Sequence, residues 1–99
     1  MKRTLQIALF VLITACSSGA SVDELVMQLK DADPDIRNNA AIELALKGED
    51  AKTAVYPLSR LLLDDNDGVR SAASYALRKI GTHDAIRVIN AHEIRGMRS

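Results

Sequence analysis

The chain has 99 residues, no formal net charge at neutral pH and only 3% aromatic residues, with no tryptophan. This length leaves room for one small domain, and the balanced charge provides no electrostatic attraction to nucleic acids. The scarcity of aromatic side chains also argues against a surface on which nucleic-acid bases stack. We therefore expect no nucleic-acid partner.

The N-terminal segment predicts a signal peptide over residues 1–15. Lys2 and Arg3 precede an apolar run at residues 5–13, which is shorter than the ~20 residues of a membrane-spanning helix and suits a secretory signal. The run ends in Ile13-Thr14-Ala15-Cys16, which resembles the lipobox of bacterial lipoproteins. The resemblance implies cleavage before Cys16 and attachment of acyl chains such as palmitate. The alternative is an ordinary signal peptide that is cut near Ala20.

A lipidated Cys16 would place the protein on a membrane of the bacterial cell envelope. Residues 16–20 would form a tether, which at ~3.5 Å per residue holds the domain within about 15 Å of the membrane surface. In a Gram-negative cell, Ser17 after the cysteine would favour the outer membrane, with the domain facing the periplasm. Cys16 is the only cysteine, so we expect neither a disulfide nor a catalytic thiol.

The segment from residue 21 to residue 99 repeats itself at an offset of 33 residues. Leu25 falls on Leu58, and Gly48 falls on Gly81, where each glycine suits the end of a helix. A period of this size indicates stacked repeats. The pattern predicts two helical units, at residues 21–48 and 51–81, and a partial unit at residues 83–95.

Capping residues mark where the helices begin. Ser21 and Glu24 form a capping box before the first apolar stripe. Asp33 and Asn66 stand at equivalent N-cap positions before the second helix of each unit. Pro57 has no N–H to donate, so it must lie in the first turn of its helix.

The second unit carries a family resemblance in the stretch DDNDGVRSAASYALRKIG. Its polar turn, aliphatic-Arg pair, alanines, leucine and final Ile-Gly resemble the HEAT-like repeat of the phycobilisome-lyase type. The resemblance implies an all-α fold, a short right-handed α-solenoid of antiparallel helix pairs with about two and a half repeats. The first unit departs from the pattern at Lys47, where an aliphatic core residue is expected.

The alternating aspartates Asp31, Asp33 and Asp35 look like a calcium loop, but the positions that follow do not fit. An EF-hand needs glycine at its sixth position and glutamate at its twelfth, where this chain has Ile36 and Ile42. Helix capping explains these aspartates better than metal binding does. We therefore expect no metal site in this turn.

No other constellation predicts catalysis. His83 and His92 lack the cysteine or histidine partners of a zinc site, and the chain has no phosphate-binding loop or nucleophile elbow. We expect no enzyme activity and no cofactor. Because some relatives within the resembled family act on bilin chromophores, a bilin-lyase-like enzyme remains the least favoured alternative.

Two arginines, Arg37 and Arg70, stand at equivalent positions of the two units. The resemblance implies that they form internal bridges to turn aspartates, Asp31 or Asp64, of an adjacent unit. The alternative is a ladder of cations that binds an external anion.

The second helices of HEAT-like proteins usually line the surface that binds a partner. By this resemblance we expect contacts with an unknown protein, which could be a second copy of the chain. The expected contact residues are Asn38, Asn39, Ile42, Ser71, Tyr75 and Arg78. The alternative is that Ile42 and Tyr75 are half-buried between the units.

The partial third unit adds an apolar stripe with Ile86, Val88, Ile89 and Ile94. An exposed stripe suggests a partner, and we expect Ile89 to contribute to it; the alternative is an amphipathic cap that completes the core. The sequence thus predicts a small, lipid-anchored adaptor or scaffold of the cell envelope. A self-associating structural lipoprotein is the second hypothesis.

Overall fold

The computed structural model describes residues 19–98 of the chain, and no strand is present in this range. The predicted signal peptide, residues 1–15, and the lipidation site Cys16 lie outside the described residues. The described part consists of helices joined by short turns. They are α2 (Val22–Gln28), α3 (Pro34–Lys47), the 3-10 helix η1 (Gly48–Ala54), α4 (Val55–Leu61), α5 (Asp67–Ile80) and α6 (His83–Arg98).

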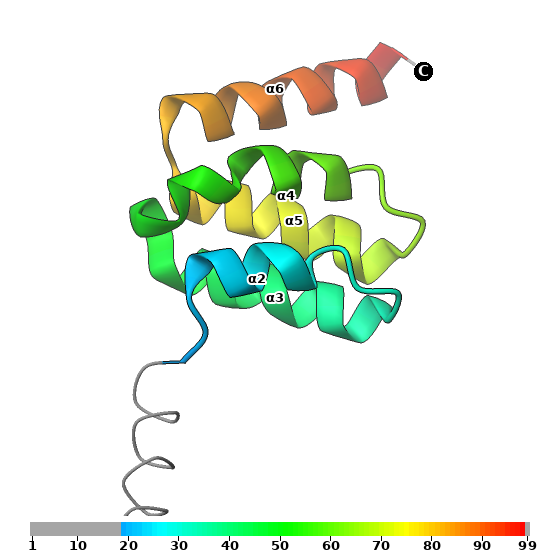
Figure 1. Cartoon of the computed structure of the whole chain (residues 1–99). Helices are drawn as coiled ribbons and strands as arrows, with labels where there is room; N and C mark the ends of the chain where they lie inside the picture. Colours follow the sequence, from blue (N-terminus) through cyan, green and yellow to red (C-terminus); the bar gives the residue numbers. More distant parts are fainter. Residues whose placement is uncertain (1–18, 99) are drawn as a thin grey trace, which may run out of the picture.

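The helices form two layers (Figure 1). Helices α2, α4 and α6 make up the first layer, and α3 and α5 lie behind them as the second layer. Helix α2 packs on α3, α4 packs on α5, and the two second-layer helices pack on each other. This stacking of antiparallel helix pairs confirms the predicted all-α fold, a short HEAT-like solenoid.

The helix starts carry the caps that the sequence predicts. The N–H of Glu24 donates to Ser21 Oγ at 3.2 Å, and the N–H of Ser21 donates to Glu24 Oε1 at 2.9 Å. The side chain of Asp33 accepts an N–H from the first turn of α3, and Asn66 Oδ1 does the same for α5. Each cap satisfies an N–H that has no partner inside the helix. Pro57 is the third residue of α4 and so lies in its first turn.

Two glycines end the second-layer helices. Gly48 follows α3 with φ of 60°, and Gly81 follows α5 with φ of 66°, a conformation that other residues adopt only at a cost. After Gly81 the chain turns directly into α6, whereas after Gly48 it first forms η1. The sequence pattern alone does not distinguish η1 from α4, the α-helix that follows it.

The buried leucines of the core recur at the same offset of 33 residues as the sequence repeat. Leu25 and Leu58 are fully buried in the first layer, and Leu44 and Leu77 are fully buried in the second. Small buried side chains where α3 and α5 meet let the two helices approach closely; they are Ala41 and Ala45 of α3 and Ala72 and Ala76 of α5.

One residue that is equivalent to a core residue is not itself in the core. Ile36 is 37% exposed, although the equivalent Val69 is fully buried. Val69 lies on the side of α5 that packs on α3, while no described helix covers the matching side of α3. Lys47 lies on that same uncovered side, so its replacement of an aliphatic residue leaves no defect in the packing.

Candidate functional site

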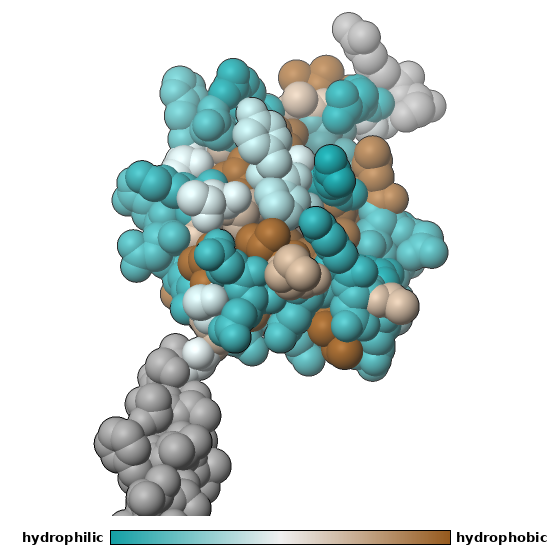
Figure 2. All heavy atoms as spheres, viewed as in Figure 1, coloured by the Kyte–Doolittle hydropathy of each residue, from teal (hydrophilic) through white to brown (hydrophobic). Residues whose placement is uncertain are grey.

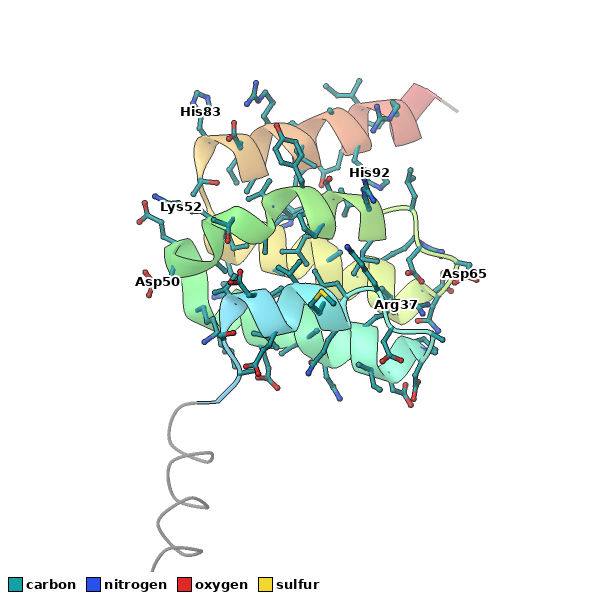
Figure 3. All side chains as sticks on the ribbon, in the orientation of Figure 1. Arg37, Asp50, Lys52, Asp65, His83 and His92 are labelled. Atoms are coloured by element: carbon teal, nitrogen blue, oxygen red, sulfur yellow. The ribbon has the colours of Figure 1, made fainter. Side chains whose placement is uncertain are left out.

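The two units are joined at their turns by Arg37 (Figure 3). Its Nε and Nη2 donate to the two carboxylate oxygens of Asp64, each at 3.0 Å. Its Nη1 donates to the backbone carbonyls of Asp31 at 2.8 Å and Ala32 at 3.0 Å. One guanidinium therefore ties the turn of the first unit to the turn of the second, as expected of an internal bridge.

The contact between Arg37 and Asp64 shifts the pKa values of both side chains. Hydrogen bonding to Asp64 raises the pKa of Arg37. Burial raises the pKa of Asp64, but the hydrogen bonds from Arg37 and from the backbone N–H of Asn66 outweigh it and hold this pKa below its usual value. Both groups therefore stay charged at neutral pH, and the bridge persists.

Arg70, the equivalent of Arg37, stays inside its own unit. Its Nη1 donates to the carbonyl of Asp64 at 2.5 Å, and Nη2 forms an ion pair with Asp67 in the first turn of α5. Because both guanidinium groups already have protein partners, the two arginines do not present a ladder for an external anion.

Several of the predicted contact residues lie next to one another on the outward face of the second layer. Ile42 and Leu46 lie one turn apart on α3, and Tyr75 and Lys79 occupy the equivalent positions on α5. Leu46 is 77% exposed and Tyr75 is 42% exposed, whereas Ile42 is half-buried. The Lys79 ammonium lies 5.7 Å from the centre of the Tyr75 ring, close enough for a cation–π contact.

We name this surface the second-layer patch. It has an apolar centre and polar edges, the composition of a small protein-binding site. Its residues are Asn38, Ile42, Leu46, Ser71, Tyr75 and Lys79. Leu46 and Lys79 were not among the predicted contact residues, although their spacing of four residues from Ile42 and Tyr75 places them on the same face.

Three other predicted contact residues lie elsewhere. Asn39 is exposed on the edge of α3 that faces away from α5. Arg78 lies on the opposite edge of the layer, where its Nη2 contacts Glu93 of α6 at 2.5 Å. Ile89 is only 3% exposed and packs in the core, so its expected role as a surface contact was wrong. Ile89 faces inward because α6 uses that side to cover α4 and α5.

Both histidines of the described range lie on α6. His83 lies at the start of α6 and His92 lies farther along, beside α4 (Figure 3). Residues 19–98 hold no group of three histidine, cysteine, aspartate or glutamate side chains placed to bind a metal ion. No helix in the same range is long and apolar enough to span a bilayer.

A comparison with protein families matches residues 22–92 of the chain to the family described as HEAT repeats. Neither the curated proteins nor the solved structures gave a match. The matched range contains both complete helix pairs and most of α6. HEAT repeats generally form non-catalytic scaffolds, and they specify a fold far better than a function.

Proposed function

The chain belongs to the HEAT-repeat family, and we propose that it works as a protein-binding adaptor with no chemistry of its own. The observation that carries this proposal is the second-layer patch, where Leu46 and Tyr75 are exposed on two helices that pack on each other. Exposed apolar side chains with polar neighbours are typical of sites that bind another protein.

The proposal includes a membrane anchor at Cys16. Support comes from the lipobox-like stretch Ile13-Thr14-Ala15-Cys16 and from the position of α2, which begins at Val22, a few residues after the expected tether. More than one acyl chain would make such an anchor stable, since a single chain binds a membrane only marginally. The adaptor would then hold its partner close to the envelope membrane.

Site-specific crosslinking tests the adaptor role. A photo-crosslinking amino acid at Tyr75 should yield one recurrent product in the native cell, and adding Leu46→Glu should abolish it. The same crosslinker at Asn90, which is exposed on α6 outside the patch, is the matched control. Products that are identical at both positions, or that survive Leu46→Glu, would contradict the proposal.

The anchor is tested separately with Cys16→Ser. This variant should lose labelling by a fatty-acid analogue and leave the membrane fraction, whereas Ser17→Ala should keep both properties. A Cys16→Ser protein that is unlabelled but stays on the membrane would rule out lipid anchoring as the cause of attachment.

Self-association is the second candidate, and one observation favours it. Ile94 and Met97 on α6 are 55% and 84% exposed, so this helix offers apolar surface to a second copy. Light scattering on the fragment of residues 17–99 distinguishes the two hypotheses. A concentration-independent dimer would favour the structural role, and a monomer would leave the adaptor role in place.

A further inference from the structure

A hollow of about 340 Å³ opens on the first layer, between α2 and α4. This volume lies at the lower end of the ~300–1,000 Å³ typical of ligand sites. The hollow exists because α2 is only seven residues long and packs on α3 and η1, with few contacts to α4. Its walls are formed by Leu29, Lys30, Tyr56, Pro57, Arg60 and Leu61.

The hollow has an apolar floor and a polar rim. Leu29 and Leu61 are 3% and 8% exposed and form the floor, with half-buried Pro57 beside them. Tyr56 is 73% exposed and lies at the rim. Figure 2, which views this layer, shows apolar patches set among hydrophilic side chains. An apolar side chain that enters the hollow would therefore be shielded from water on several sides.

The two cations of the rim differ from most of the arginines of the second layer and α6. Arg37, Arg70, Arg78 and Arg87 each pair with a carboxylate. Lys30 and Arg60 are exposed, and neither forms an ion pair with any residue in the described part of the chain. Two unneutralised cations beside an apolar floor complement a ligand that carries both a carboxylate and an apolar group.

We propose that this hollow binds an acidic segment of a partner protein. One apolar side chain of the segment contacts Leu29 and Leu61, and neighbouring carboxylates pair with Lys30 and Arg60. The exposed ring of Tyr56 packs on the inserted side chain. This inference rests on the adaptor function and adds a second contact surface, on the layer opposite the second-layer patch.

The shape of the hollow favours a peptide over a bilayer. A concave site between two helices accepts a side chain that projects from a partner, whereas a bilayer surface is nearly flat and reaches only the rim. Attraction of two cations to anionic lipid is also weak, because membrane-binding segments usually combine several basic residues.

Fluorescence anisotropy on the purified full chain tests the inference. The probe is a fluorescein-labelled peptide of alternating Leu and Glu, and its matched control has Gln in place of every Glu. We expect the acidic peptide to bind and the Gln peptide to bind about tenfold more weakly or not at all. Lys30→Gln and Arg60→Gln should each weaken the acidic peptide several-fold, with unchanged circular dichroism. Lys52→Gln removes an equal charge from η1, away from the hollow, and should have no effect.

Four outcomes would overturn the inference. The first is equal binding of the two peptides, and the second is an equal loss in Lys52→Gln and Arg60→Gln. The third is binding to vesicles of phosphatidylglycerol that requires Arg60 while peptide binding does not, because this would make the hollow a membrane site. The fourth is absence of binding by the acidic peptide; if the Tyr75 crosslinks persist in that case, the adaptor role still stands without the hollow as a binding site.

Discussion

The two second-layer helices, α3 and α5, share a sequence pattern but differ along both of their edges. Each buries a leucine at the equivalent position, Leu44 in α3 and Leu77 in α5. The stripe of α5 that packs on α3 is apolar and at most 4% exposed, and it consists of Val69, Ala72, Ala76 and Ile80. The equivalent stripe of α3 is mostly polar and open, and it consists of Ile36, Asn39, Glu43 and Lys47.

The opposite edges show the reverse difference. Ala41 and Ala45 of α3 are buried where α5 covers them. Their equivalents on α5 are Ser74 and Arg78, and Arg78 reaches Glu93 of α6 instead of an apolar neighbour. A position in this repeat is therefore apolar where another helix covers it and polar where the described part of the chain leaves it open.

The largest effect is expected when a residue of one stripe is replaced by its equivalent from the other stripe. Ala76→Glu would put a carboxylate at a fully buried position between α5 and α3. We expect it to lower the free energy of unfolding by about 3 kcal/mol or more, because the charge loses water and gains no partner. Urea unfolding followed by circular dichroism measures this change.

Glu43→Ala is the reciprocal control, since Glu43 is exposed at the same position of α3. We expect its effect to stay within about 0.5 kcal/mol, as for most surface substitutions. Comparable losses in the two variants would mean that the open edge of α3 is covered in solution, and the comparison between the stripes would fail.

A smaller effect is expected for the equivalent arginines. Arg37→Gln removes the bidentate contact to Asp64 and two hydrogen bonds to carbonyls of its own turn. Arg70→Gln removes only contacts inside the second unit. We expect Arg37→Gln to lower the melting temperature by several degrees and Arg70→Gln by clearly less. Equal shifts in calorimetry would show that the link between the units adds no stability.

The same bridge predicts a dependence on pH. Folding holds the pKa of Asp64 below its usual value, so the unfolded chain takes up this proton first. The stabilisation is complete above the pKa of an unfolded aspartate, about 4, and is lost as the pH falls through the lower pKa of the folded state. Asp64→Asn should therefore reduce the loss of stability in acid.

Asp31→Asn is the control for this experiment. Asp31 is equivalent to Asp64 and also accepts an N–H two residues later. Its carboxylate forms no ion pair within residues 19–98 and acts on Arg37 only through a weaker coulombic interaction. If Asp31→Asn reduced the acid sensitivity as much as Asp64→Asn, the effect would come from the turns in general and not from Arg37.

Local patterns predicted much of the fold because the physics that sets it is local. The capping box of Ser21 and Glu24, the caps at Asp33 and Asn66 and the two terminal glycines each depend on residues close in sequence. The offset of 33 residues then predicted which side chains repeat in the core, because stacked units bury equivalent faces.

The remaining features depend on which faces meet, and a repeat pattern alone does not specify that. Ile36 and Val69 match in sequence but differ in burial, since only Val69 has a neighbouring helix over it. Ile89 was expected at the surface and lies in the core for the same reason. The hollow beside Tyr56 lies between α2 and α4, and its lining residues come from two units.

The smallest effect is expected for the N-cap residues of the two second-layer helices. Asp33 accepts the N–H of Asp35 at 2.9 Å, and Asn66 accepts the N–H of Val69 at 3.0 Å. Asp33→Ala and Asn66→Ala should each cost about 1 kcal/mol in urea unfolding, because each leaves one N–H of the first turn without its side-chain partner.

The control for the cap of α3 is Asp33→Asn, which keeps an oxygen acceptor and should cost much less than Asp33→Ala. The two alanine variants test whether the units are equivalent at their turns. If Asn66→Ala lowers the free energy of unfolding clearly more than Asp33→Ala does, the turn of the second unit contributes more to stability than the turn of the first. Such a difference has a physical cause, because Asp64 in that turn also accepts two hydrogen bonds from Arg37 of the first unit. A change that loosens this turn would therefore weaken the bridge as well as the cap.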